Sequence, residues 1–166
     1  MPDTFTKIAT LTAGAGGAAS IDFTFIPSRY TDLCVKISSR AVNNGTDYML
    51  INFNTLTSNF SAIYLDGSGS TVTSSTLARF AGRIVDNAAT SNTFSNNEIY
   101  IFNYAGSNNK SYSVDGVNEN NATTANSDLI GGLWSNTAAI TSIGLTTASG
   151  NFAQYSTATL YGIKKD

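Results

Sequence analysis

Histidine is absent from this sequence of 166 residues, and cysteine occurs once, at Cys34. Without histidine the chain cannot build a Ser/His or Cys/His nucleophilic site or a histidine-ligated metal site, which excludes many hydrolase classes. A single cysteine cannot form a disulfide within the chain. Because Cys34 lies between Leu33 and Val35 with no activating base beside it, we expect a small, partly buried residue with an unreactive thiol.

Charge is also scarce. Asp, Glu, Lys and Arg make up only 12% of the residues, about half the usual share, and the formal net charge is −2. No basic stripe is present to neutralise phosphates or anionic lipid headgroups, so we expect binding neither to nucleic acid nor to membranes. Residues 1–7 lack the basic and apolar regions of a signal peptide, and no segment approaches the roughly 20 apolar residues of a membrane span. We therefore expect a soluble product made in a cytoplasm.

What the sequence does contain is alternation of apolar and polar residues with a period of two. Ile21, Phe23 and Phe25 alternate with polar residues and predict one strand that ends at Pro27, with all three side chains facing inward. Leu33–Ile37 alternates in the same way and predicts a second strand. Further strands are predicted at Phe5–Leu11, Tyr48–Asn54, Ala62–Leu65, Leu77–Val85, Glu98–Tyr104, Lys110–Val117, Leu129–Trp134, Thr141–Leu145 and Tyr155–Ile163.

Turn-forming segments rich in Gly, Asn and Ser separate these strands about every dozen residues. About ten short strands at this spacing predict an all-β chain with two packed antiparallel sheets, a β-sandwich of the jelly-roll type. A closed barrel is the alternative. We find no proline-rich linker and no fixed-period repeat, so residues 1–166 are expected to form one domain, with residues 1–11 as an N-terminal strand or an assembly arm.

Carboxylates are the remaining candidates for acid–base chemistry. Asp115 and Glu119 lie four residues apart near a strand end, and Glu98 begins the preceding predicted strand, so these three could cluster. A glycosidase needs two such groups roughly 5–9.5 Å apart. The alternative is that they are solvated or pair across strands with residues such as Lys110. We predict no catalytic, cofactor-binding or metal-binding residue, and we keep a carbohydrate-cleaving site at these carboxylates as a rival hypothesis.

Two loops and the aromatic residues are the other candidates for ligand binding. Segments 43–47 and 66–70 carry oxygen-bearing side chains beside glycine, the chemistry of calcium sites, although turns of the same composition need no metal. Trp134 lies in the apolar run Leu129–Trp134 and is expected to pack in the core. Sugar stacking on aromatic faces is the alternative reading for Trp134 and for the scattered tyrosines: Tyr30, Tyr48, Tyr64, Tyr104, Tyr112 and Tyr155.

Four segments, taken together, resemble a known group of proteins. They are "FTFIPSRYTDL" (23–33), "EIYIFNYAGSNNKSYSVDGVNENNAT" (98–123), "GLWSNTAAITSI" (132–143) and "NFAQYSTATLYGIK" (151–164). In order and over most of the chain they resemble small virion proteins of tailed bacteriophages that infect aquatic bacteria. The resemblance implies a jelly-roll-like sandwich that assembles on the virion. It carries over no functional residue, because the shared motifs are structural.

Within that group, two roles are implied. The first is a capsid decoration, or cement, protein that binds the major capsid protein on the outer head surface, with a homotrimer implied by the threefold positions of such shells. The second is a tail fibre or tip module that binds host surface glycan. Long fibre proteins place such modules after shaft segments, whereas this chain begins at Met1 with the domain itself. We therefore expect the decoration role, without enzymatic activity.

Overall fold

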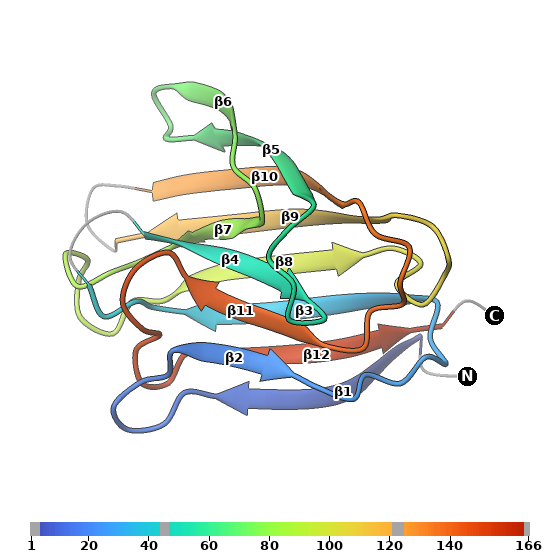
Figure 1. Cartoon of the computed structure of the whole chain (residues 1–166). Coiled ribbons are helices and arrows are strands. Elements are labelled where there is room, and N and C mark those ends of the chain that lie inside the picture. The colour runs from blue at the N-terminus through green and yellow to red at the C-terminus, as the bar shows by residue number, and fades with distance from the viewer. Residues whose placement is uncertain (1–3, 44–46, 121–124, 165–166) are drawn as a thin grey trace.

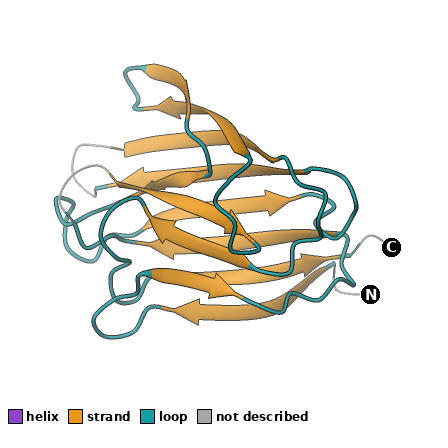
Figure 2. Ribbon diagram, viewed as in Figure 1, coloured by secondary structure: helices purple, strands orange, loops and turns teal. Residues whose placement is uncertain are grey.

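The computed structural model describes residues 4–43, 47–120 and 125–164. It contains β-strands connected by turns and loops, with no helix in the described chain (Figure 2). The strands are β1 (Phe5–Thr12), β2 (Ser20–Phe23), β3 (Asp32–Ser39), β4 (Asp47–Phe53), β5 (Phe60–Gly67), β6 (Val72–Thr76), β7 (Phe80–Ile84), β8 (Ser95–Ile101), β9 (Lys110–Glu119), β10 (Ala125–Trp134), β11 (Ile143–Thr147) and β12 (Thr157–Ile163).

These strands form two antiparallel sheets that pack face to face (Figure 1). The larger sheet has the order β1-β12-β3-β8-β9-β10-β5-β6, and the smaller has the order β2-β11-β4-β7. The quartets β1-β12-β3-β8 and β2-β11-β4-β7 have the strand order of a jelly roll. Two hairpins inserted into that chain order, β5–β6 and β9–β10, extend the larger sheet. The predicted all-β sandwich is confirmed.

The core lies between the two sheets and is built from the inward positions of the alternating strands. Leu33, Val35 and Ile37 of β3 are buried there, as their alternation predicts, and so are Ile21 and Phe23 of β2. Facing residues come from both layers, so one continuous apolar cluster holds the sheets together. Burial of such side chains stabilises the fold by about 1.5–3 kcal/mol each.

The prediction for Phe25 is wrong. β2 ends at Phe23, and Phe25 is 95% exposed in a left-handed backbone conformation with φ of 54°. Pro27 explains the early end of the strand, because the chain leaves the sheet before it reaches the proline ring, which fixes the backbone angle φ. The apolar–polar alternation in the sequence therefore extends to Phe25, one apolar residue beyond the end of the strand.

A second difference concerns residues 72–85. The strand predicted at Leu77–Val85 begins only at Phe80, because Arg79 adopts a positive φ of 64° and turns the chain between two strands. Before that turn the structure has a strand that the sequence analysis omitted, β6. Its residues are Val, Thr and Ser with all five side chains exposed, so no apolar alternation marks it.

The hairpin of β8 and β9 confirms the strand–turn–strand prediction for residues 98–120. Lys110 closes its connection from inside: the side chain is buried, and Nζ donates to the carbonyls of Gly106 at 2.7 Å, of Asn108, and of Thr137 at 3.3 Å. Burial lowers the pKa of Lys110. The expectation that Lys110 pairs with a nearby carboxylate is therefore wrong; this lysine is bound by backbone carbonyl groups.

The predicted N-terminal strand is β1, an edge strand that pairs with β12. The part of the expected assembly arm before residue 4 lies outside the described residues. Thr10 and Thr12 face Thr159 and Thr157 across this pair, with hydroxyl oxygens 3.0 and 3.2 Å apart. These hydroxyl pairs help β1 to join the sheet without any charged contact.

Two neighbouring glycines of β10 give a matched stability test. A Cβ on Gly132 would lie 2.0 Å from Cζ of Tyr112, a buried ring whose hydroxyl donates to the carbonyl of Phe80, whereas a Cβ on Gly131 meets nothing within 4 Å. We expect Gly132→Ala to lower the free energy of unfolding by about 1–3 kcal/mol through overpacking. Gly131→Ala should change it little. Urea denaturation measures both, and equal losses would contradict the packing described.

Candidate functional site

The outer face of the larger sheet, turned away from the core, carries exposed apolar side chains on β5 and β10. Ile63, Leu65 and Leu129 are 58%, 48% and 57% exposed, and we call these three residues the apolar patch. Leu65 and Leu129 lie directly opposite each other across the β5–β10 pair, and Ile63 lies opposite Gly131. Isolated exposed apolar residues are common on surfaces, but a contiguous group indicates an interaction site.

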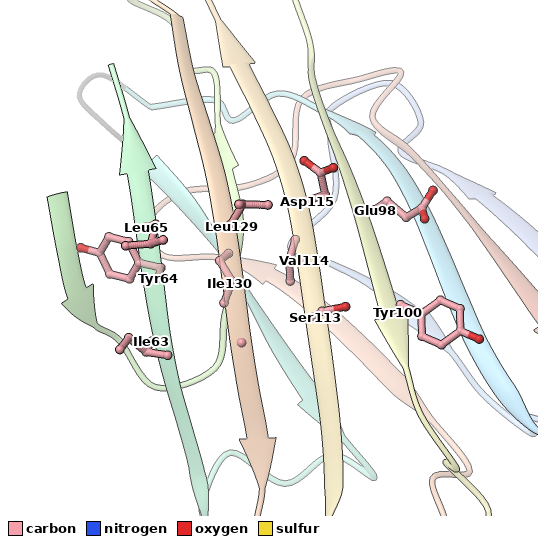
Figure 3. A pocket seen from close by; sticks show the side chains of 11 residues that line it. Ile63, Tyr64, Leu65, Glu98, Tyr100, Ser113, Val114, Asp115, Leu129 and Ile130 are labelled. Carbon is pink, nitrogen blue, oxygen red and sulfur yellow. The ribbon is translucent and has the colours of Figure 1, made fainter. Parts of the chain in front are cut away.

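Strand register places charged residues beside this patch. Leu129 faces Asp115 on β9, Asp115 faces Glu98 on β8, and Glu98 faces Lys36 on β3. Figure 3 shows the Asp115 and Glu98 side chains on neighbouring strands, next to Leu129. The outer face therefore changes from apolar to charged along one row of cross-strand neighbours.

An open groove of about 440 Å³ runs over this boundary (Figure 3). Gly131 and Ser113 are the smallest residues in it and face each other across β9 and β10, so they leave space between larger neighbours. The apolar patch borders one side, and Glu98, Asp115 and Tyr100 border the other. Shallow depressions of about 690 and 370 Å³ continue on the same face, one near Leu133 and one near Val117. The geometry suits an extended contact with a partner surface.

The charged row contains one ion pair. Lys36 Nζ lies 3.0 Å from Glu98 Oε2, and both side chains are about half exposed. The hydrogen bond to Glu98, followed by its negative charge, raises the pKa of Lys36. A surface pair of this kind contributes roughly 0–1 kcal/mol to stability. Its greater effect is to leave Asp115 as the unpaired carboxylate nearest the apolar patch.

The three carboxylates considered as a cluster are only partly brought together. Glu98 and Asp115 are cross-strand neighbours, but Glu119 lies four residues further along β9, roughly 13 Å away at the usual rise of a strand. Both neighbouring carboxylates lie on an open sheet face with no enclosing wall. Enclosure would be needed to exclude water from a hydrolytic site of the kind that a glycosidase uses.

Cys34 on β3 and Tyr100 on β8 are cross-strand neighbours beside the groove. Cys34 is fully buried, and burial is the main cause that raises the pKa of its thiol to about 11, which fits the expected unreactive residue. The Tyr100 hydroxyl donates to Asp32 at 2.8 Å, while the other Asp32 oxygen accepts from the backbone N–H of Asn103. Burial, then this hydrogen bond, raises the pKa of Tyr100 to about 12. Tyr100 is thus held in place at the groove edge.

Trp134 is fully buried, which confirms the core prediction and excludes the alternative that this ring stacks on a sugar. Its ring packs against Phe53 and Phe60, with centroids 5.5 and 6.0 Å away. Among the tyrosines considered for stacking, only Tyr155 is largely exposed. The buried ones are Tyr30, Tyr104 and Tyr112, and the half-buried ones are Tyr48 and Tyr64.

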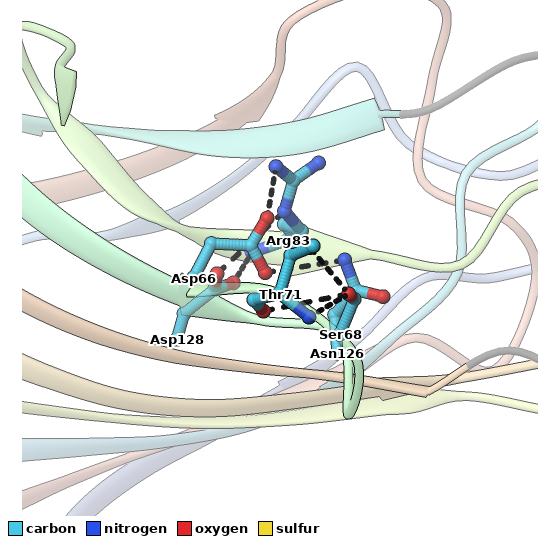
Figure 4. Close-up of polar contacts among 6 residues, drawn as sticks. All are labelled: Asp66, Ser68, Thr71, Arg83, Asn126 and Asp128. Atoms are coloured by element: carbon cyan, nitrogen blue, oxygen red, sulfur yellow. Dashed lines mark hydrogen bonds and ion pairs between the residues drawn. The ribbon is translucent and has the colours of Figure 1, made fainter. Parts of the chain in front are cut away.

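The loop at 66–70 is a tight hairpin turn whose acidic residue is already engaged. Asp66 accepts from Arg83 at 2.6 Å and from Asn126 at 3.2 Å, and Asp128 accepts from the backbone N–H of Arg83 at 2.9 Å (Figure 4). Within the described residues, no group of three or more His, Cys, Asp or Glu side chains converges. The other candidate, the loop at 43–47, lies partly outside the described residues.

The sequence analysis missed the apolar patch itself. A signal was present: in both β5 and β10, apolar residues occupy both strand faces, with Tyr64 and Ile130 inward and Leu65 and Leu129 outward. Loss of alternation of this kind is typical of strands covered on both sides. Here no described part of the chain covers one of those sides, and this property makes it a candidate site.

Buried Asp128 predicts a pH effect on stability. Burial raises its pKa above the ordinary 3.8, so the folded state holds this proton more tightly than the unfolded state does. The contribution of this group to the free energy of unfolding is full below pH 3.8 and is lost as pH rises through the folded pKa. Relative to wild type, Asp128→Asn should therefore gain stability as pH rises from about 3.5 to 6, measured by urea denaturation. A difference that stays constant or falls contradicts it.

Comparison with known proteins adds no function to this surface. No family model, no curated protein sequence and no solved structure matches the chain. The described residues contain no helix long and apolar enough for a membrane span. The case for a function therefore rests on the geometry of the outer face.

Proposed function

We propose that this protein is a non-enzymatic structural subunit that docks on a partner protein through the outer face of its larger sheet. The observation that carries the proposal is the apolar patch, three neighbouring side chains that are each about half exposed on a rigid sheet. A sheet presents such residues at fixed spacing, so little conformational entropy is lost when they are covered.

The size of the patch argues for repeated binding. Covering the remaining exposed half of each side chain yields roughly 1 kcal/mol, or about 3 kcal/mol for the three. Association costs an estimated 4–15 kcal/mol, so this patch alone supports only weak binding and the surrounding groove must contribute. Many copies on one lattice, or several joined in an oligomer, overcome that limit through effective concentration.

The chemistry of the surface fits this role better than catalysis. Around the patch the contacts come from Ser113, Asp115 and the Lys36–Glu98 pair on an open face. These polar and charged groups form a rim around the apolar patch, which is the usual arrangement of a protein–protein interface. With no histidine in the chain, we propose no enzymatic activity.

The resemblance to tailed-phage virion proteins directs the choice of partner. We propose that the partner is the major capsid protein and that the subunit decorates and stabilises the outer surface of the head, as a homotrimer that assembles only on the threefold positions of the shell. A subunit that binds only the assembled shell stabilises it by mass action. Synthesis would take place in the host cytoplasm, with assembly onto the virion afterwards.

One pair of variants tests the docking surface. Leu129→Glu places a charge in the centre of the apolar patch, whereas Leu56→Glu alters a leucine of similar exposure in the β4–β5 connection. We expect Leu129→Glu to weaken binding to purified assembled head shells by about tenfold or more, and Leu56→Glu to bind like wild type. Co-sedimentation with the shells measures this. Equal binding by both variants, or localisation of the protein only on tails by imaging, would overturn the proposal.

A tail module that binds host glycan is the second candidate, and one observation favours it. Tyr100 and Phe102 form a tilted aromatic pair with centroids 4.6 Å apart, and Phe102 is 48% exposed next to Tyr100, whose hydroxyl binds Asp32. An exposed ring next to hydrogen-bonding groups is typical of sugar sites. For this function we expect signals on a glycan array that Phe102→Ala removes and Leu56→Glu does not. Wild-type protein that binds no glycan eliminates the candidate.

A further inference from the structure

The larger sheet ends at β6, and the outer side of this strand has no neighbour among the described residues. β6 pairs only with β5, and all five of its residues are exposed. In Figure 1 the β5–β6 hairpin extends beyond the body of the sandwich at the edge of the sheet. A strand in this position presents unpaired backbone groups to whatever approaches.

The hydrogen bonds at both ends of the hairpin show which backbone groups are unpaired. Ser68 N–H donates to the Thr71 carbonyl at 3.0 Å, and Leu77 N–H donates to the Ala62 carbonyl at 3.2 Å. Because hydrogen-bonded and non-bonded positions alternate along an antiparallel pair, residues 71, 73, 75 and 77 bond to β5. The N–H and C=O groups of Val72, Ser74 and Thr76 therefore point away from the sheet.

β6 also differs from the other edge strands in its charge. Each of the others carries a charged residue, namely Lys7 in β1, Asp22 in β2 and Arg83 in β7, and the pairings of β1 and β7 contain register shifts. Charges and bulges of this kind prevent edge-to-edge association. β6 has a regular pairing, and residues 67–78 include neither a charge nor a proline. Among the four edge strands, β6 is the one that lacks both a charge and a bulge.

We propose that β6 pairs antiparallel with β6 of a second copy of this chain, about a twofold axis at Ser74. In this register Ser74 faces Ser74 of the second copy, and Val72 of each copy faces Thr76 of the other. These are three hydrogen-bonded pairs. About six backbone hydrogen bonds result, two for each pair, and they satisfy the unpaired groups of all three outward positions on both strands.

The strand that pairs with β6 is assigned to a second copy of this chain because the β6 sequence can pair with itself. A charged strand would face its own charge across a twofold axis, whereas β6 brings together hydroxyl and β-branched side chains, which form favourable cross-strand pairs. The pairing also makes the two larger sheets continuous. The apolar patches of both copies then lie on one extended face, which enlarges the docking surface proposed above.

Two substitutions at one position test the pairing. Ser74→Pro removes the outward N–H but leaves the β5 pairing intact, and Ser74→Ala retains that N–H. Sedimentation equilibrium up to about 1 mM protein should show wild type and Ser74→Ala in a monomer–dimer equilibrium and Ser74→Pro shifted toward monomer. Monomeric wild type over the whole range, or equal association of the two variants, would overturn the proposal. Neither result depends on capsid binding.

A cross-linking experiment covers the case in which Ser74→Pro fails to fold. Ser74→Cys should give a covalent dimer with a short bis-maleimide, because the proposed register brings the two Cα atoms to about 5.5 Å. The native Cys34 is fully buried and does not compete. Ser127→Cys is the matched control, on the exposed face of β10. Equal yields from the two positions would indicate association through the sheet face and would overturn the edge pairing.

Discussion

The larger sheet has two faces, and the smaller sheet packs against only one of them. β7 crosses behind β8, β9 and β10 on the inner side, and the core forms there. On the other side every outward residue must be stable in water or covered by another molecule. The candidate site lies on that uncovered face.

The outer face meets that requirement in two ways. At the β1–β12 end, threonines pair with threonines, and their uncharged hydroxyl groups keep this part of the face hydrated. At the β5–β10 end, leucine and isoleucine occupy the same outward positions. The inserted strands β5 and β10 therefore supply the apolar patch, and the jelly-roll strands β1 and β12 supply the hydroxyl pairs. In our proposal the inserted hairpins contact the partner protein, and the jelly-roll strands support them.

Alternation was sufficient to predict the fold class and most strands, because strands such as β3 bury one face and expose the other. It failed where a strand has no buried face, as in β6, or where the chain turns outward before the pattern ends, as at Phe25. The pairing of Asp115 with Glu98 follows from register, which the sequence does not reveal. Lys110 was misjudged because a charged residue is normally exposed, and its burial depends on three carbonyl groups, two in the β8–β9 connection and one at Thr137.

The position of β12 has a consequence for biosynthesis. This strand lies between β1 and β3, so β1 has no partner in its sheet and β3 has only β8 until residues 157–163 have left the ribosome. Unpaired strands exposed during translation are prone to associate with other nascent chains. Closure of the sandwich therefore waits until β12 has been synthesised and has left the ribosome.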